Sequence, residues 1–310
     1  EFNEANPDIN LNVEVVSWND IYTVVNTRIA NGEAPDVLNI DVFADYQADD
    51  LLLPIQDVVS EETYSKMYDA FLAQSEVDGT VWAIPDLASA RAMYYNKDIL
   101  DAAGVEVPTT WDEFEEVLQK LSDAGIQPLT TGGSDKWGAT RLINAYAVRT
   151  AGNDIMTKAA DGEVPYTDEK LVAAADKIAE WAEKGYFGEG ITTVDMNTAG
   201  SMLMSGKAAI FYNGSWFTQN LTDDSQNPAG EDGIGFFNIP VADESISSAT
   251  SYSMNCGNIL ALDNDKYDEA TGWFLKYFME NIGNVAMEDQ GTVKGYTYDV
   301  AADDMDNYTK

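Results

Sequence analysis

The sequence contains no histidine and only one cysteine, Cys256, among its 310 residues. Without histidine the chain cannot form Ser-His-Asp or Cys-His nucleophilic sites, use imidazole as a general base, or build the common zinc sites. A lone cysteine forms no internal disulfide, and the apolar surroundings of Cys256 predict a small buried residue. We therefore expect no catalytic residue, no metal site and no cofactor.

Basic residues and long apolar runs are also scarce. Seventeen Lys and Arg stand against 54 Asp and Glu, for a formal net charge of −37. Such a charge repels the phosphate backbone of nucleic acid and anionic lipid headgroups, so neither is expected as a partner. No stretch reaches the roughly 18 to 20 apolar residues that cross a bilayer, and no basic segment followed by an apolar one opens the sequence. The part of the protein represented by this sequence is expected to fold in water.

The length of the chain and the pattern of its apolar residues predict an α/β protein of two domains. Apolar and polar residues alternate from Ile9 to Val15, as in a half-buried strand. A helix is predicted from Ser17, with Asp20 at capping-box spacing, to Gly32, and a buried strand over 34–40. Strand, helix and strand in this order predict a parallel sheet.

The same pattern recurs along the chain. Helices are predicted from Thr110 to Gly125, over 168–184 and from about Tyr267, and a strand over 208–212. No Gly/Ser-rich or Pro-rich linker divides the sequence, so the two domains are expected to share several crossings. In such a layout the ligand is expected in the crevice between the domains, at the carboxyl ends of the strands.

Four segments in order resemble the bacterial extracellular solute-binding protein family 1, which includes the maltose-binding protein. They are FNEANPDINLNVEVV with NGEAPDVLNID, GTVWAIPDLASARAMYYNKDILDAAGVEVPTTWDEFEEVLQKL, MLMSGKAAIFYNGSWFTQNL, and CGNILALDNDKYDEATGWFLKYF. The resemblance implies a periplasmic-binding-protein type II fold, in which a multi-strand hinge joins two α/β lobes around a ligand cleft. Compared with the family, the sequence looks truncated at both ends.

The resemblance also implies where the lobes divide. We expect lobe 1 to comprise 1–91 and 249–290, and lobe 2 to comprise 92–248 and 291–310. The chain would cross at the hinge strand Tyr94-Tyr95-Asn96, near 240–248 and near 290–296. Rotation about these crossings would close the lobes over a ligand.

Sugars present apolar C–H faces and a rim of hydroxyls, so a sugar site needs aromatic rings together with carboxylates and amides. Trp216 matches a tryptophan of the family that commonly stacks on ligand, Trp18 opens a helix beyond a strand end, and Trp137 lies in a polar loop. For each, packing against a helix or the core is the competing role. The ligand-binding residues that we predict are Trp18, Asp41, Phe43, Asp86, Ser89, Arg91, Trp137, Asn213, Ser215, Trp216, Tyr252 and Asn255.

Several of the remaining site residues have equally plausible structural roles. Asp41 directly follows a predicted strand, Phe43 is either a contact or an anchor for the loop, and Arg91 is either a clamp for a hydroxyl or carboxylate or a salt bridge. Few basic residues in aromatic-rich loops favour a neutral sugar over an anion. Only a partial anion site would come from Arg91, Lys136, Arg141 and Lys294.

The resemblance implies the extracellular solute-binding component of an ABC importer, which binds a mono- or oligosaccharide and delivers it to the permease subunits. We expect a monomer located outside the cell membrane, either as a cell-surface lipoprotein or in the periplasm. Polyamines remain an alternative ligand because carboxylates are abundant. Two other hypotheses are a glycoside hydrolase, with Asp41 and Asp86 as a carboxylate pair, and a surface adhesin that binds glycans.

Overall fold

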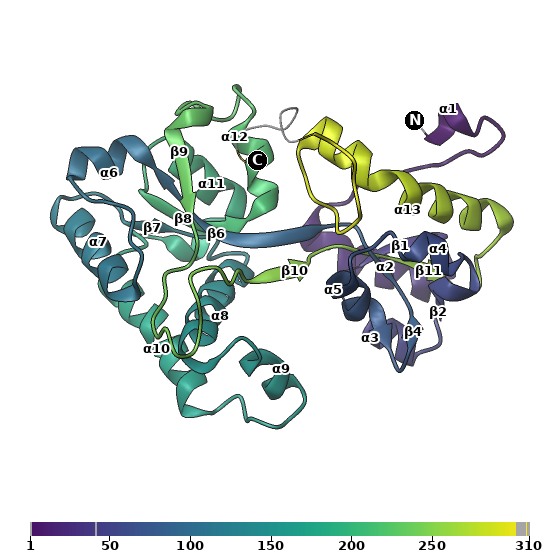
Figure 1. Cartoon of the computed structure of the whole chain (residues 1–310), viewed down its shortest axis with the longest axis horizontal. Coiled ribbons are helices and arrows are strands. Elements are labelled where there is room, and N and C mark those ends of the chain that lie inside the picture. Colours follow the sequence, from purple (N-terminus) through teal and green to yellow (C-terminus); the bar gives the residue numbers. More distant parts are fainter. Residues whose placement is uncertain (1, 41, 302–307, 309–310) are drawn as a thin grey trace. The chain divides into compact units, whose positions relative to one another are not determined.

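The computed structural model describes residues 2–40, 42–301 and 308, with the side chain of Asn255 also left out. The chain forms two compact units. The first comprises Glu1–Ser89 and Met254–Lys310, and the second comprises Ala90–Ser253 (Figure 1). No helix in the described part of the chain is long and apolar enough to cross a bilayer.

The boundaries of these units differ from the predicted lobes. The crossing predicted at Tyr94-Tyr95-Asn96 falls inside the second unit, because the chain leaves the first unit at Ser89. The segment after 290 was expected in lobe 2, but it pairs with the first unit. The Tyr68 amide donates to the Gly295 carbonyl, and the Thr297 amide donates to the Lys66 carbonyl, each over 2.9 Å.

The first unit is built on a small sheet with β11 at its centre. β1, β2 and β5 all pair antiparallel with β11. The parallel pairing predicted from the strand-helix-strand order is wrong, because the segment 9–15 forms no ladder in the described structure. The helices are α1 (Phe2–Ala5), α2 (Trp18–Ala30), α3 (Ala44–Ala48), α4 (Glu61–Tyr64), α5 (Asp69–Leu72) and α13 (Glu269–Gln290). The strands are β1 (Val37–Ile40), β2 (Leu52–Leu53), β3 (Glu76–Val77), β4 (Thr80–Val81), β5 (Ile84–Pro85), β10 (Met254–Cys256) and β11 (Ile259–Asp263).

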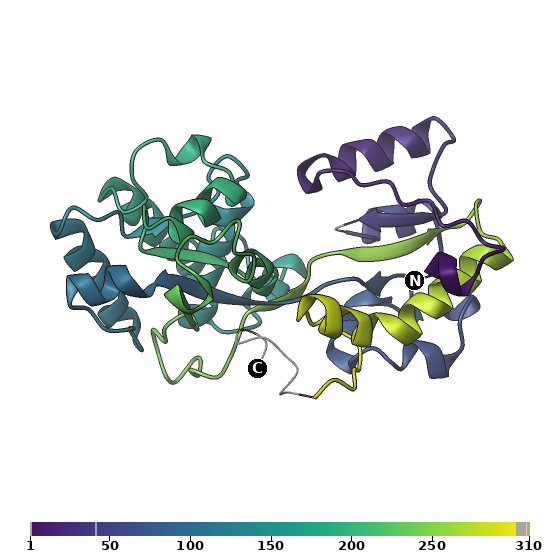
Figure 2. The ribbon, with the colours of Figure 1, turned by 90° about the horizontal axis from the view of Figure 1, so that it is seen from above.

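Both faces of this sheet are covered. Ile259 and Ala261 of β11 join the cluster that packs under α2, whereas Leu260 and Leu262 join the cluster under α13. Figure 2 shows these two helices on opposite faces of the sheet. Because successive residues of a strand point to opposite faces, a strand that is buried on both faces needs an uninterrupted apolar run.

The second unit has a sheet in which β6 and β8 are central. β8 pairs antiparallel with β6 and parallel with β7, and β9 pairs antiparallel with β6. The strands are β6 (Ala88–Asn96), β7 (Leu129–Thr130), β8 (Ile210–Gly214) and β9 (Ile234–Phe237). The helices are α6 (Lys97–Ala103), α7 (Trp111–Asp123), α8 (Trp137–Ala151), α9 (Ile155–Ala160), α10 (Glu169–Glu183), α11 (Met196–Met204) and α12 (Thr218–Leu221).

The core of this unit is aromatic. Trp111 of α7 and Trp181 of α10 are buried and stack with ring centroids 5.4 Å apart and planes inclined by 11°. On β8, Ile210 and Tyr212 join this cluster. Phe211, between them, points to the other face and meets the ring of Phe217 at 5.2 Å. Because side chains alternate along β8, Ile210 and Tyr212 pack into the main core, whereas Phe211 packs against Phe217 on the opposite face.

The predicted helices over 17–32, 110–125 and 168–184 are confirmed as α2, α7 and α10. The helix predicted from about Tyr267 begins at Glu269 and runs to Gln290, and the strand predicted over 208–212 is β8. The strand predicted from Ile9 to Val15 is wrong. Val13 is 70% exposed and Val15 is 90% exposed, and no described residue forms a ladder with this segment. A strand needs a paired neighbour, which alternation alone cannot supply.

Thr110 and Ser17 offer a test of helix capping, because only one of them caps with its side chain. The Glu113 amide donates to Thr110 Oγ1 over 3.3 Å, and Glu113 Oε2 accepts from the Thr110 amide over 3.1 Å. The Ser17 side chain makes no cap bond. We expect Thr110→Ala to lower the free energy of unfolding by about 1 kcal/mol. Urea unfolding followed by circular dichroism measures this loss, and Ser17→Ala is the matched control. An equal loss in both variants would contradict the assignment.

Candidate functional site

Two tryptophans predicted as ligand contacts, Trp137 and Trp216, lie together in the second unit. Their ring centroids are 6.1 Å apart and their planes are inclined by 62°. We call Trp137 and Trp216 the aromatic pair. The guanidinium carbon of Arg91 lies 4.4 Å from the Trp216 ring centroid and 5.8 Å from that of Trp137. Three predicted site residues, distant in sequence, thus form one assembly.

Trp216 is placed by the turn that follows β8. The Tyr94 hydroxyl donates to the Gly214 carbonyl over 3.3 Å. Phe217, the next residue after Trp216, is buried, with its ring 5.1 Å from that of Tyr94. Trp216 itself stays half-buried. The buried Phe217 anchors the turn, and the half-buried Trp216 remains available to a ligand.

Trp137 is placed by the close approach of α8 to the preceding loop. Gly138 comes so near this loop that a Cβ there would lie 2.5 Å from Thr131 Oγ1. Lys136 precedes the helix with a φ of +63°, a conformation that costs energy for a residue with a Cβ. Trp137 is half-buried at the first position of the helix. The backbone that presents this ring is therefore constrained on both sides.

Arg91 stands on β6 directly opposite Gly214 of β8. It is only 4% exposed, and its backbone amide donates to the Ser253 carbonyl over 2.8 Å. Burial lowers the pKa of Arg91 to about 10, and the charge of Arg141 acts in the same direction. Arg91 stays a cation at neutral pH, and a cation near an indole face is attracted by the ring's electrons. Arg91 thus contacts both rings of the aromatic pair, and it remains a predicted ligand contact.

Arg149 and Tyr212 belong to the same region but are missing from the predicted set. The terminal nitrogens of Arg149 donate to the carbonyls of Ile239, Ser248 and Ser251 over 2.7 to 2.9 Å. Tyr212 is buried, which raises its pKa to about 12 against the opposing charges of Arg91, Arg141 and Arg149. The sequence does contain a signal for Arg149. Residues 137, 141, 145 and 149 are spaced four apart, so they lie along one face of α8.

The other predicted residues of the second unit have differing surroundings. Asn213 is buried, and its side-chain oxygen accepts from the Gly214 amide over 2.9 Å. Ser215 is half-buried, and its carbonyl accepts from the Thr218 hydroxyl over 2.8 Å. Tyr252 is 45% exposed and lies near Arg149. All three remain predicted ligand contacts. Asn255 is in β10, and its side chain is outside the described part.

Four predicted residues belong to the first unit. Trp18 opens α2 and is 42% exposed, whereas Phe43 is buried among apolar residues, a position that favours its anchoring role. Asp86 faces Lys294, with Oδ1 3.7 Å from Nζ, and burial raises its pKa despite that lysine. Ser89 is fully buried, and its hydroxyl has no hydrogen-bond partner in the described part of the protein. These roles stay predictions, and Asp41 lies outside the described residues.

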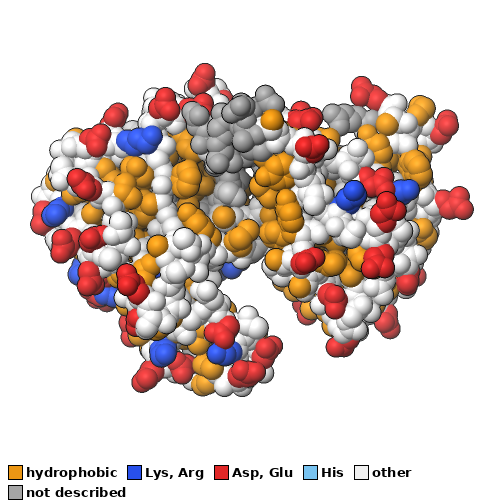
Figure 3. Space-filling view, viewed as in Figure 1, with side chains coloured by type: hydrophobic (Ala, Val, Ile, Leu, Met, Phe, Trp, Pro, Cys, Tyr) orange, Lys and Arg blue, Asp and Glu red, His pale blue; other side chains and the backbone are white. Residues whose placement is uncertain are grey.

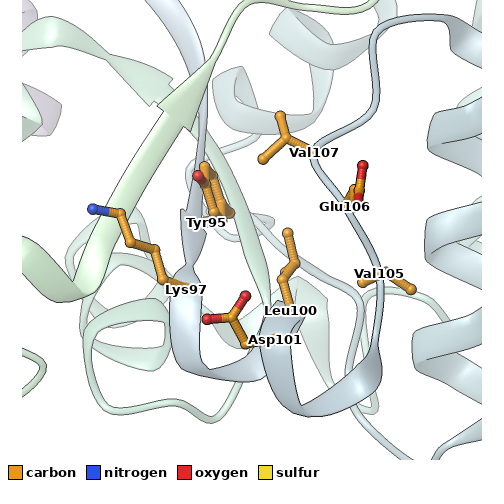
Figure 4. A pocket seen from close by; sticks show the side chains of 7 residues that line it. All are labelled: Tyr95, Lys97, Leu100, Asp101, Val105, Glu106 and Val107. Atoms are coloured by element: carbon orange, nitrogen blue, oxygen red, sulfur yellow. The ribbon is translucent and has the colours of Figure 1, made fainter.

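The second unit also has a hollow of about 250 Å³ (Figure 4). Leu100 and Val105 lie at its apolar wall, with Tyr95, Lys97 and Asp101 around them. Ligand pockets for organic molecules usually exceed about 300 Å³. Tyr95 is also four residues along β6 from Arg91, or about 13 Å, so the hollow is separate from the aromatic pair. Among the described residues, no group of three His, Cys, Asp or Glu is placed to hold a metal.

The chain belongs to the bacterial extracellular solute-binding protein family, whose model matches residues 1–284. A Rhizobium meliloti protein named "Probable sugar-binding periplasmic protein" is 29% identical over 218 residues, covering 65% of this chain and 51% of the relative. The multiple sugar-binding protein of Streptococcus mutans is 25% identical over 246 residues, covering 77% and 57%. The chain spans about half the length of the curated relatives it matches.

Solved structures share the fold. A structure from work on xylan utilization by the thermophilic bacterium Caldanaerobius polysaccharolyticus has a TM-score of 0.90 at 22% identity, covering 99% of this chain and 80% of the other. A chitin oligosaccharide binding protein has a TM-score of 0.88 at 22% identity, covering 99% and 78%. RafE in complex with raffinose has a TM-score of 0.78 at 20% identity, covering 99% and 80%. The predicted periplasmic-binding-protein type II fold is confirmed.

The support that Arg91 gives to the aromatic pair can be measured without any ligand. The two indoles lie close enough, with ring centroids 6.1 Å apart, for their transitions to couple, and far-ultraviolet circular dichroism detects this coupling. We expect Arg91→Met to reduce the coupled signal because the cation–π attraction is lost, and Arg91→Lys to retain part of it. Trp216→Phe removes the coupling of this pair but not that of the stacked Trp111 and Trp181, so its difference from the wild type calibrates the measurement. An unchanged spectrum in Arg91→Met, with normal thermal unfolding, would contradict the supporting role.

Tyr212 gives this region a dependence on alkaline pH. Because its pKa is about 12 in the folded state against 10 ordinarily, the folded protein holds the phenol proton more tightly than the unfolded chain. This contribution to stability is complete below pH 10 and is lost as the pH rises toward 12. It amounts to about 2 to 3 kcal/mol.

We expect Tyr212→Phe to show a correspondingly smaller loss of unfolding free energy between pH 10 and pH 12 than the wild type. Urea unfolding at several alkaline pH values measures the difference. Parallel curves for the two proteins would show that Tyr212 titrates normally.

Proposed function

We propose that this chain is the ligand-binding part of an ABC importer, that it binds a mono- or oligosaccharide, and that it delivers this ligand to permease subunits. The observation that carries the proposal is the aromatic pair held against Arg91 in the second unit. Family membership supports binding rather than catalysis. We further propose that the protein has no catalytic activity and works outside the cytoplasmic membrane, as a lipoprotein or in the periplasm.

The geometry of the aromatic pair suits a sugar. An indole offers a flat apolar surface on which the C–H face of a pyranose can stack, and it loses little entropy on binding because it is already held. Arg91 lies against the Trp216 ring at 4.4 Å and so occupies one face. The opposite face is the one we assign to the ligand.

The relatives support the same ligand class. The Rhizobium meliloti and Streptococcus mutans proteins are named for sugar binding, and the structural neighbours include a chitin oligosaccharide binding protein and a raffinose complex. A polyamine is disfavoured because Arg91, Arg141 and Arg149 place positive charge around the site. Among the charged side chains of the face drawn in Figure 3, acidic ones predominate over basic ones.

Substitutions in the aromatic pair test the proposal. Isothermal titration with xylo-, chito- and malto-oligosaccharides and with raffinose would first identify a ligand. We then expect Trp216→Ala and Trp137→Ala each to weaken binding by about 10- to 100-fold, because each removes a stacking surface. The matched control is Trp273→Ala. Trp273 is 49% exposed on α13 of the first unit, and it has no assigned part in binding.

The same titrations separate the alternatives. Binding of a polyamine but of no sugar would overturn the assignment of the ligand class. Release of reducing ends from a bound oligosaccharide would show an enzyme instead. Equal losses in Trp216→Ala and Trp273→Ala would place the sugar site elsewhere.

A further inference from the structure

The arginines of this acidic protein are unevenly placed. The sequence contains Arg28, Arg91, Arg141 and Arg149, and the last three all act on the phenol of Tyr212. We call these three the arginine cluster. The net charge of the chain is −37, so a local gathering of cations is opposite to the general character of the protein. The cluster lies entirely within the second unit.

The observed partners of the cluster are largely uncharged. Arg149 donates to three backbone carbonyls, and Arg91 packs against the two indole rings. No carboxylate of the described chain forms an ion pair with Arg141 or Arg149. Carbonyls and ring faces satisfy the geometry of a guanidinium, but they do not cancel its charge. Among the described residues, no carboxylate pairs with Arg141 or Arg149 to balance their charges.

Arg141 is the member that a ligand can reach. It is half-buried rather than buried, unlike Arg91 at 4% and Arg149 at 2% exposure. It follows Trp137 by four residues on α8, so the two side chains share one face of that helix. Among the described residues its guanidinium has neither an ion-pair nor a hydrogen-bond partner. A free guanidinium thus stands one helical turn from the aromatic pair.

We propose that the arginine cluster, through the guanidinium of Arg141, binds the carboxylate of an acidic sugar whose ring stacks on the aromatic pair. This inference rests on the proposed function and names its substrate class. A carboxylate offers two oxygens at the spacing of the guanidinium N–H groups, which allows a two-point contact. A neutral sugar would leave the charge of Arg141 uncompensated. The acidic sugar differs from the neutral sugar that few basic residues in aromatic-rich loops had favoured.

Matched neutral and acidic ligands test the proposal by isothermal titration. Suitable pairs are α-1,4-galactobiose with α-1,4-digalacturonic acid, and xylotriose with xylotriose carrying glucuronic acid. A phosphorylated disaccharide separates carboxylate from phosphate recognition. We expect the wild type to bind the acidic member of at least one pair at least tenfold more tightly, a preference that declines between 20 and 500 mM salt.

Charge-matched variants then locate the contact. Arg141→Gln should cost the acidic ligand at least tenfold more affinity than its neutral partner, and Arg141→Lys should retain part of the preference. Arg28→Gln changes the net charge equally but lies in the first unit, where Arg28 pairs with Glu14, so it should leave the preference intact. Thermal unfolding checks that each variant is folded.

Each outcome has a separate meaning. Tight neutral binding with weaker acidic binding would overturn this inference and leave the proposed function standing. The inference would also be overturned by equal losses for both ligands in Arg141→Gln, or by a preference for the phosphorylated sugar alone. Binding of no sugar at all would overturn the proposed function and this inference together.

Discussion

The antiparallel register between β6 and β8 determines both the core of the second unit and its candidate site. It places Arg91 opposite Gly214 and Met93 opposite Tyr212. Because side chains alternate along a strand, Arg91, Met93 and Tyr95 share one face of β6. The inner part of that face packs into the aromatic core, and Arg91, near the end of β8, meets the indoles instead. A shift of one residue would move every one of these side chains to the other face.

The local structure of this protein could largely be predicted from its sequence. α7 has a capping box at Thr110 and an apolar stripe of Phe114, Val117, Leu118 and Leu121, and these features depend only on neighbouring residues. Long-range pairing could not be predicted in the same way. The alternation from Ile9 to Val15 has no ladder in the described structure, and β1 pairs with a strand more than 200 residues away. Alternation of apolar and polar residues shows that a segment can form a strand. Whether it does depends on a partner strand with which it can pair.

The residues of the candidate site also differ in how well the sequence predicts them. Trp137 was recognisable because a large apolar ring in a polar loop has little local core to join, and Trp216 because it matches a tryptophan of the family. The structure brings the two rings together. The arginines were harder to assess, since Lys136 and Lys294 looked equivalent to Arg91 and Arg141 in the sequence. Folding pairs Lys294 with Asp86, whereas it gathers Arg149 with the other two around Tyr212. The local charge of a site depends on which side chains the fold brings together, so the net charge of the whole chain predicts it poorly.

The central position of β11 has a consequence for how the protein is made. Its partners β1, β2 and β5 are all synthesised before residue 86, but β11 itself begins at Ile259. The second unit is a single continuous segment, Ala90–Ser253, and can fold as soon as it has emerged. The first unit must hold three unpaired strands until the chain returns. Its loop-closure cost is therefore reduced when the second unit folds first and brings Ser89 and Met254 close together. We therefore expect the inserted unit to assist the folding of the unit that encloses it in sequence.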